Sequence, residues 1–276
     1  MLFTNNFTTQ GHRGARGYLP ENTIQSCCRA IELGADGLEV DVCVSADKQI
    51  IVSHEPFMSR LICSFPDGKP VNTEGGLLLK NMTAREIQQF DCGSRGNARF
   101  STQQPVKCFK PTLYELVSGV HTFCELRKLP QPFWNIEVKS HPKWYGRLVP
   151  KPSIFCTLLK HPLSILPKNG FYVSSFDPFF LRVLRREMPK IPLAFLTEHR
   201  ETFSDSCKRL GFSPTIYSPF YKNITTSMVE NVHKRGVKLM TWTVNDAATM
   251  RRLKNMGVDG IITDFPDSIN FAKFRH

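Results

Sequence analysis

Short runs of apolar residues alternate with helical patterns along almost the whole chain. Nine such runs predict strands at 7–12, 38–44, 49–54, 133–138, 171–174, 193–196, 215–218, 238–244 and 260–263. Apolar residues at helical spacing fill most of the intervals between them. Repeated strand–helix units of this kind predict parallel strands covered by helices. We therefore expect an α/β fold, a single (β/α)8 barrel that spans residues 1–276.

The helical intervals carry start and stop signals. In the first, Asn22 stands at the cap position, Ile24, Cys27 and Ile31 follow at helical spacing, and Gly34 ends the pattern. Two later helices are predicted to end near 236 and 257, where glycines again follow the apolar spacing.

Nine strands are one more than the barrel uses, and the third explains the excess. Only the sequence SADK separates Val44 from Gln49, which is too short for a crossover helix. The second and third strands are therefore predicted to form a hairpin, with Asp41 and His54 close across its two arms. Residues 57–111 then break the strand–helix rhythm with Gly, Pro and polar residues, which predicts an inserted segment rather than another unit.

The composition is that of a soluble globule with a sizeable core, with 41% hydrophobic and 22% charged residues among 276. No apolar run reaches the length that spans a bilayer. The N-terminus, MLFTNNFTTQ, lacks the features of a secretory signal, which favours the cytoplasm, although a trimmed N-terminus would look the same.

The charge balance favours an anionic partner. Lys and Arg number 36 against 24 Asp and Glu, a net charge of +12. The basic residues are scattered over helical segments, without a dense basic run or a nucleic-acid motif. We therefore expect no nucleic-acid partner; phosphate esters and anionic lipid remain, and solvated helix faces are the default explanation of the basic residues. The nine cysteines form no CxxC pair and show no metal-ligand spacing, which predicts reduced core thiols.

Polar residues gather where the predicted strands end, which in a barrel of this kind is the mouth that holds the active site. These strand-end residues are His12, Arg13, Glu39, Asp41, His54, Glu137, Lys139, Trp242 and Asp264. Taken singly, each has an ordinary explanation, as a solvated face, a structural histidine or a core tryptophan. Their joint position at one mouth favours a site.

The residue types in this group indicate a particular chemistry. Glu39, Asp41 and Glu137 would repel one another without a cation, and ligation by oxygen alone favours Mg²⁺ or Ca²⁺. Two histidines beside such a metal can share general-base and general-acid roles. Arg13 offers a planar fork for phosphate oxygens, and Lys139 a point charge.

The sequence also resembles the glycerophosphodiester phosphodiesterases, a family of metal-dependent (β/α)8-barrel enzymes. Five motifs carry the resemblance in the family's order and span nearly the whole chain: HRG at 12–14 with PENT at 20–23, EVD at 39–41, SHEP at 53–56, EVK at 137–139, and TWTVN at 241–245 with GIITDFPD at 260–267. Glu55 departs from the family, which more often has Asp at that position.

The resemblance implies a role for each matched residue. It makes His12 and His54 the catalytic acid/base pair, and Glu39, Asp41 and Glu137 the ligands of one divalent cation. It assigns Arg13 and Lys139 to the substrate phosphate, Trp242 to the glycerol moiety, and the inserted segment to the enclosure of the glycerol end. Glu21, within PENT, either braces Arg13 or contacts substrate.

We therefore expect metal-dependent hydrolysis of a small glycerophosphodiester to an alcohol and sn-glycerol 3-phosphate, either through a cyclic phosphate or by direct attack of water. Two alternatives stay open at this point. One is a sphingomyelinase D-like phospholipase on the same barrel, and the other is a non-catalytic barrel that binds polyanions. The sequence specifies neither the head group nor the oligomeric state.

Overall fold

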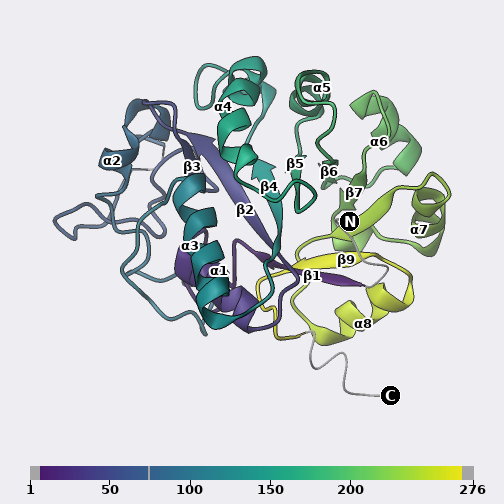
Figure 1. The fold of residues 1–276 in the computed structure, drawn as a ribbon, viewed down its shortest axis with the longest axis horizontal. Helices are drawn as coiled ribbons and strands as arrows, with labels where there is room; N and C mark the ends of the chain where they lie inside the picture. Colours follow the sequence, from purple (N-terminus) through teal and green to yellow (C-terminus); the bar gives the residue numbers. More distant parts are fainter. Residues whose placement is uncertain (1–6, 74, 269–276) are drawn as a thin grey trace.

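Eight parallel strands close into a barrel in the computed structural model, which describes residues 7–73 and 75–268 (Figure 1). The barrel strands are β1 (Thr8–His12), β2 (Gly37–Val44), β4 (Phe133–Val138), β5 (Phe171–Ser175), β6 (Leu193–Thr197), β7 (Ile216–Pro219), β8 (Lys238–Thr241) and β9 (Gly260–Thr263). They pair in this order, and β9 returns to pair with β1. The predicted (β/α)8 barrel is confirmed.

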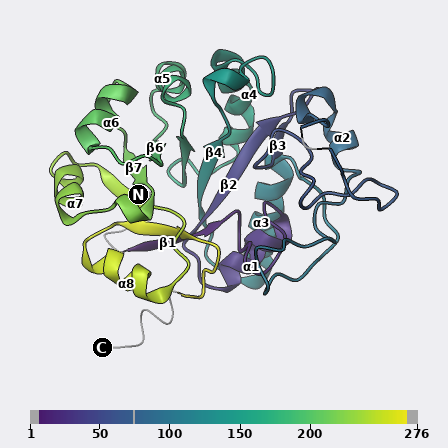
Figure 2. The same ribbon diagram turned by 180° about the vertical axis from the view of Figure 1, so that it is seen from behind.

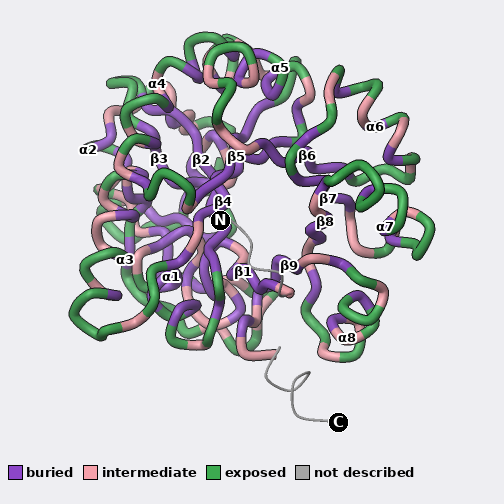
Figure 3. Tube along the Cα trace, turned by 45° about the vertical axis from the view of Figure 1, so that its right-hand side comes forward, coloured by how far each residue is buried: buried purple, intermediate pink, exposed green. Residues whose placement is uncertain are grey.

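Helices cover the outside of the barrel and connect successive strands (Figure 2). They are α1 (Ile24–Glu32), α3 (Leu113–Arg127), α4 (Pro152–Ser164), α5 (Pro178–Glu187), α6 (Phe203–Leu210), α7 (Thr226–His233) and α8 (Ala247–Asn255). Figure 3 shows the buried strands as the inner ring, while the exposed positions lie on the outer helices. None of the helices within the described residues is long and apolar enough to cross a membrane.

The hairpin predicted from the short SADK connection is present. Strand β3 (Ile50–Val52) pairs antiparallel with β2, so that Val42 faces Val52 and Val44 faces Ile50. It ends before the predicted residue 54, because after the bond from Ser53 N–H to the carbonyl of Asp41 (2.9 Å) the chain leaves the ladder. Strand β8 is also shorter than predicted. Of the two apolar residues that extended the prediction, Trp242 lies at the barrel mouth, whereas Val244 is buried in the core with Leu239 and Ile261.

The cap of the first helix differs from the prediction by one residue. Thr23, not Asn22, is the N-cap of α1, and its side chain accepts from the Ser26 N–H at 3.1 Å. Asn22 instead has a φ of 59° and directs its side chain to Asp41. The prediction was wrong because both residue types favour N-caps, and only the tertiary contact of Asn22 distinguishes them.

Residues 57–111 lie at the edge of the barrel beyond β3 (Figure 1). Within this 57–111 segment are a 3₁₀ turn, η1 (Leu79–Asn81), and a short helix, α2 (Ala84–Ile87). Its buried apolar residues pack together and against Cys43 and Ile51 of the hairpin. Two side chains join it to the loop after β1, because Thr102 donates to the Gly17 carbonyl (2.7 Å) and Gln103 to the Arg16 carbonyl (2.6 Å).

Candidate active site

A cavity of about 320 Å³ opens at the carboxyl ends of the barrel strands. One side of it is lined by His12, Glu39, Glu137 and other charged residues, and the opposite side by Phe176, Leu196 of β6, and Trp242, which follows β8. The position follows from the strand pattern. In β2, Leu38, Val40 and Val42 are buried apolar positions, so the alternate residues Glu39 and Asp41 project to the other face of the strand, into the barrel.

Three carboxylates meet inside this mouth. Glu39, Asp41 and Glu137 each offer an oxygen, and these oxygens all lie within 4.8 Å of one another. Their side chains are buried, and within the described residues Glu39 Oε1 has no hydrogen-bond partner. Burial, together with the negative charges of Asp41 and Glu137, raises the pKa of Glu39 well above its usual value. Such a buried, repelling set is stabilised by a cation in its centre.

Asp41 is held from three directions. Asn22 donates to Oδ2 at 2.9 Å, and the Nε of Arg13 lies 3.1 Å from the same oxygen. Lys139 Nζ lies 3.1 Å from Oδ1 and donates to Glu137 at 2.5 Å. Burial alone would raise the pKa of Asp41, but the charges of Lys139 and Arg13 lower it well below its usual value. Asp41 is therefore ionised even before a metal binds.

His12 stands at the end of β1 with its two ring nitrogens in different surroundings. Nδ1 is 2.7 Å from Asp264 Oδ1, and Nε2 faces the carboxylates, 3.9 Å from Glu39 Oε2. Asp264 also accepts from Arg16 Nε at 2.5 Å and from Asn245 Nδ2 at 2.7 Å. With Nδ1–H donated to Asp264, Nε2 keeps its lone pair toward the cavity. Burial, followed by the charge of Arg16, lowers the pKa of His12 to about 4, so the ring is neutral and able to accept a proton.

His54 follows β3 and lies on the more open side of the mouth. Its side chain is 33% exposed, and Nδ1 is 2.9 Å from Glu55 Oε1. The hydrogen bond and charge of His54 outweigh burial and lower the pKa of Glu55 to about 2. Glu55, at a position where the family more often has Asp, thus contacts the ring of His54 beside it.

Arg13 and Glu21 come together through the tight turn after β1. Arg13 has a φ of 52° and Gly14 a φ of 83°, so the chain reverses within two residues. A Cβ on Gly14 would lie 2.6 Å from the Ser26 backbone carbon, so only glycine fits there. The turn directs Arg13 Nη1 to Glu21 Oε1 at 2.7 Å. Glu21 therefore braces Arg13, the first of the two predicted alternatives, and it is not among the residues that line the cavity.

An aromatic group forms the opposite side of the mouth. Trp242 donates Nε1–H to the Ser218 carbonyl at 3.0 Å, which fixes its ring. Phe176 packs edge-on against it with ring centroids 5.2 Å apart, and Phe220 lies 5.5 Å away on the other side. Glu198, beyond the end of β6, also lines this side.

The structure brings all nine predicted site residues to one end of the barrel. Seven of them line the cavity, while Asp41 and Glu21 lie behind it. No described residue of the 57–111 segment belongs to the lining, and the enclosure of the glycerol end by that segment stays a prediction. Sequence reasoning assigned no part in the site to several residues that complete it: Arg16, Asn22, Phe176, Glu198, Asn245 and Asp264. Asp264 had a signal, as a carboxylate at a strand end, but its partner His12 lies 252 positions away.

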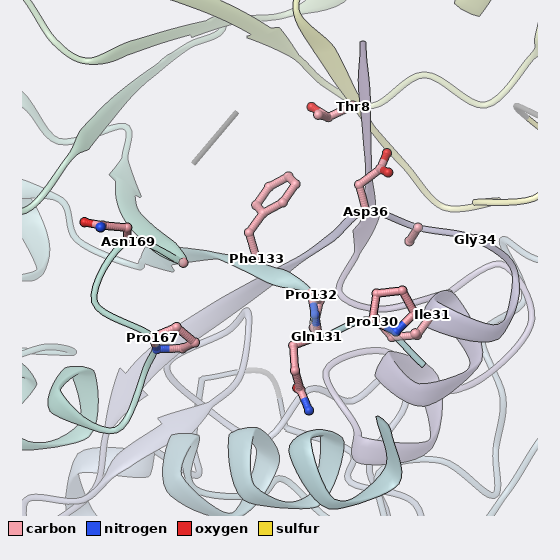
Figure 4. Close-up of a pocket in the computed structure, with 12 residues that line it drawn as sticks. Thr8, Ile31, Gly34, Asp36, Pro130, Gln131, Pro132, Phe133, Pro167 and Asn169 are labelled. Atoms are coloured by element: carbon pink, nitrogen blue, oxygen red, sulfur yellow. The ribbon is translucent and has the colours of Figure 1, made fainter. Parts of the chain in front are cut away.

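A larger cavity, of about 500 Å³, lies at the opposite end of the barrel (Figure 4). Thr8, Asp36 and Phe133, at or before the starts of β1, β2 and β4, are among the residues that line it. Asp36 accepts from the Thr9 N–H at 2.7 Å, and the remaining lining residues are uncharged. Size alone would have selected this cavity, but the convergent titratable groups lie at the other end.

Comparison with known proteins adds independent information. A family model described as the glycerophosphoryl diester phosphodiesterase family matches residues 12–268. The chain is similar to a glycerophosphodiester phosphodiesterase of Caldanaerobacter subterraneus, with 33% identity over 260 residues and 94% of each chain covered. It is also similar to a Bacillus subtilis protein of the same name, with 29% identity over 99% of this chain and 88% of the other.

Solved structures share the fold over nearly the full length. A putative glycerophosphoryl diester phosphodiesterase from Silicibacter pomeroyi superposes with a TM-score of 0.85 at 25% identity, covering 97% of this chain and 93% of the other. A phosphodiesterase from Oleispira antarctica, solved with its product sn-glycerol-3-phosphate, gives a TM-score of 0.76 at 22% identity, with 97% of each chain covered. At 22% identity, the similarity to the Oleispira antarctica protein shows the fold alone.

Proposed function

The chain belongs to the glycerophosphoryl diester phosphodiesterase family, and on that premise we propose that it hydrolyses small glycerophosphodiesters to an alcohol and sn-glycerol 3-phosphate with one divalent cation. It is an enzyme of the phosphoric diester hydrolase class, as the family and the similar proteins indicate. The observation that carries the proposal is the cluster of Glu39, Asp41 and Glu137 at the wall of a cavity that His12 and His54 line.

The residues present fit a hard divalent cation. All three ligands are carboxylates, which suits Mg²⁺ or Ca²⁺ rather than zinc. The unpartnered Glu39 Oε1 and the raised pKa of Glu39 both indicate that a positive charge belongs beside it. A bound cation would polarise a phosphate oxygen and lower the pKa of a coordinated hydroxyl.

The two histidines are suited to opposite proton transfers. His12 is neutral, and its Nε2 is aimed into the cavity, so it takes the proton from the attacking hydroxyl or water. His54 lies at the more open side, beside the ionised Glu55, and gives a proton to the departing alcohol oxygen. These two transfers leave His12 protonated and His54 neutral. The pair returns to its starting state by proton exchange with water or, on the cyclic-phosphate route, by the reverse transfers when water opens the ring.

The cations of the mouth hold the substrate phosphate in this proposal. Arg13 lines the cavity while Glu21 and Asp41 fix its guanidinium. Lys139 lies among the carboxylates, where its Nζ contacts both Asp41 and Glu137. Phosphate binding therefore requires Lys139 to turn from these carboxylates as the metal takes over their charge. Trp242 offers an apolar face to the glycerol carbons.

The direct test is a release assay for glycerol 3-phosphate over glycerophosphocholine, glycerophosphoethanolamine and glycerophosphoglycerol. Lysophosphatidylcholine is followed in parallel by the release of choline and lysophosphatidic acid, since its cleavage yields no glycerol 3-phosphate. We expect EDTA to abolish turnover of the water-soluble diesters, and added Mg²⁺ or Ca²⁺ to restore it. Release of a phospho-head group in place of glycerol 3-phosphate would contradict the assignment, as would full activity in a verified metal-free sample. Preferential cleavage of lysophosphatidylcholine would favour the phospholipase alternative.

A pair of variants separates the two cationic roles. Glu137→Ala should lose the metal and the activity together, measured by calorimetric titration with the metal. Lys139→Ala should keep metal affinity but weaken the binding of inorganic phosphate. If Lys139→Ala loses the metal as fully as Glu137→Ala does, Lys139 orders the carboxylates and does not bind phosphate.

A further inference from the structure

Two buried cysteines of the 57–111 segment face each other across a short pair of extended strands. Ser64 and Asp91 form an isolated antiparallel bridge and exchange both backbone bonds, Ser64 N–H to Asp91 O at 2.6 Å and Asp91 N–H to Ser64 O at 3.1 Å. The next pair in this register is Cys63 opposite Cys92. Because bonded and non-bonded pairs alternate along an antiparallel ladder, Cys63 and Cys92 occupy a non-hydrogen-bonded pair.

The backbone bonds of the two cysteines agree with that register. Cys92 N–H points away from Cys63 and donates to the Cys108 carbonyl at 2.7 Å, while the Cys63 carbonyl accepts from Val71 N–H at 3.1 Å. Facing residues in a non-hydrogen-bonded pair have Cα atoms about 4.5 Å apart, inside the range of about 4.4–6.8 Å that a disulfide spans. The side chains meet in the same way, with the two Sγ atoms 2.9 Å apart.

We propose that Cys63 and Cys92 are a dithiol pair that closes into a cross-strand disulfide on two-electron oxidation, and so ties the 57–111 segment together covalently. The two thiols are free in this structure. The inference does not depend on the catalytic proposal, since neither cysteine lines the catalytic cavity.

The surroundings make Cys63 the thiol that reacts first. The hydrogen bond from Cys92 lowers the pKa of Cys63, and the positive charge of Lys110 lowers it further. Lys110 is buried, and Ser53 Oγ, at 2.9 Å, is its only hydrogen-bond partner within residues 7–73 and 75–268. No carboxylate of the described residues forms an ion pair with it, which leaves its ammonium charge available to a thiolate nearby.

Cys108 is also buried in this segment, yet it does not complete a metal site. The three carboxylates of the mouth are the only group of three potential ligands that converge among the described residues. A pair of thiols with one cation beside it suits oxidation rather than metal binding.

Cys63 is fully buried and Cys92 is only 4% exposed, so an oxidant that acts on the pair must be small. Hydrogen peroxide meets this requirement. The Cys63 thiolate attacks one oxygen of hydrogen peroxide, breaks the O–O bond and becomes a sulfenic acid, and the hydroxide released takes up a proton. Cys92 then attacks Cys63 Sγ, the S–S bond forms, and the sulfenic oxygen leaves as water with the Cys92 proton. Two thiols and one peroxide thus give one disulfide and two waters.

The consequence is local and mechanical. The bond would close a loop between positions 29 apart in sequence, which contains η1 and α2. The same segment holds the loop after β1 through Thr102 and Gln103. Oxidation would therefore fix the segment that supports the turn carrying Arg13.

The test compares the full-length protein before and after peroxide treatment, with free thiols then alkylated. Before alkylation we expect a mass about 2 Da below that of the reduced protein, and after alkylation two fewer alkyl groups than on the reduced protein, with one peptide pair joined at Cys63 and Cys92. Trypsin cleavage after the exposed Arg85, which lies between the two cysteines in sequence, should yield two fragments that stay together on a non-reducing gel and separate on a reducing gel. The melting temperature should rise by about 5–10 °C, as expected for a loop of this size.

Serine variants supply the controls. Cys63→Ser and Cys92→Ser should each lose the joined peptide and the rise in melting temperature, while Cys108→Ser, in the same buried segment, should keep both. The proposal is overturned if the wild-type protein forms no Cys63–Cys92 peptide under peroxide, if Cys92 joins Cys108 instead, or if the linked protein melts no higher than the reduced one. All three results are read from the wild-type chain, so they do not depend on the folding of any variant.

Discussion

Asp264 connects the end of β9 to the proposed base, and its replacement by asparagine isolates that connection. In the structure its carboxylate accepts from His12 Nδ1 at 2.7 Å and from Arg16 Nε at 2.5 Å. An amide of the same shape keeps one acceptor oxygen but loses the charge. A hydrogen bond to a charged group contributes about 1.5–3 kcal/mol. If this contribution is lost when His12 becomes charged in the transition state, kcat should fall about 10- to 150-fold.

The pH dependence supplies a second readout of the same variant. Asp264 raises the pKa of His12 against the lowering by burial and Arg16. Asp264→Asn should therefore lower that pKa further, so the acid limb of kcat/KM, where the base becomes protonated, should move to lower pH. KM should change little, because Asp264 is not among the residues that line the cavity.

The assay is glycerol 3-phosphate release at saturating metal over a series of pH values. Asp205→Asn, an exposed carboxylate on α6, is the matched control and should leave both rate and profile unchanged. Wild-type kcat with an unmoved acid limb in Asp264→Asn would refute the orientation of His12 by Asp264. A rise in KM with unchanged kcat would point instead to a role in substrate binding.

Four further substitutions test the supports of the site and of the barrel. Asn22→Ala removes two hydrogen bonds to Asp41 and should weaken metal binding about 10- to 100-fold in calorimetric titration. Its control, Thr23→Ala, removes the N-cap of α1 and should cost about 1 kcal/mol of stability while metal affinity stays unchanged. Equal metal affinity in both variants would contradict the role of Asn22. Gly14→Ala adds a Cβ that lies 2.6 Å from a backbone carbon of α1, at a residue whose φ is 83°. It should lower the free energy of unfolding by about 2–4 kcal/mol in urea titration. A loss under 1 kcal/mol would show that the turn relaxes to fit the side chain. The Asp259 carboxylate accepts hydrogen bonds from a backbone N–H, a lysine and a histidine. Burial raises the pKa of Asp259, but these hydrogen bonds lower it below its usual value. The stability that they contribute is therefore present above the unfolded pKa of about 4 and is lost as pH falls. Asp259→Asn should thus cost about 1–3 kcal/mol at pH 7 and less at pH 3, and an equal loss at both pH values would exclude an ionic origin.

The barrel could be predicted because its determinants are local in the sequence. Alternating apolar strands and amphipathic helices recur in order, and a four-residue connection left only a hairpin for β2 and β3. The same strand ends identify the mouth, so His12, Glu39 and Glu137 could be assigned to one site before any contact was known. Residues two apart on a strand share a face, which placed Glu39 with Asp41 and Glu137 with Lys139.

The tertiary structure decided which partner each polar residue takes. Asn22 and Thr23 are equally good caps by type, and only the proximity of Asp41 assigns Asn22 to the carboxylate. Asp264 meets His12 because β9 closes the ring against β1, a contact that no local pattern contains. The facing of Cys63 and Cys92 likewise depends on a single bridge inside a segment with no periodic pattern. Sequence periodicity reports burial along one element, whereas hydrogen-bond partners and charge pairs depend on distances between elements, which exist only once the barrel has closed.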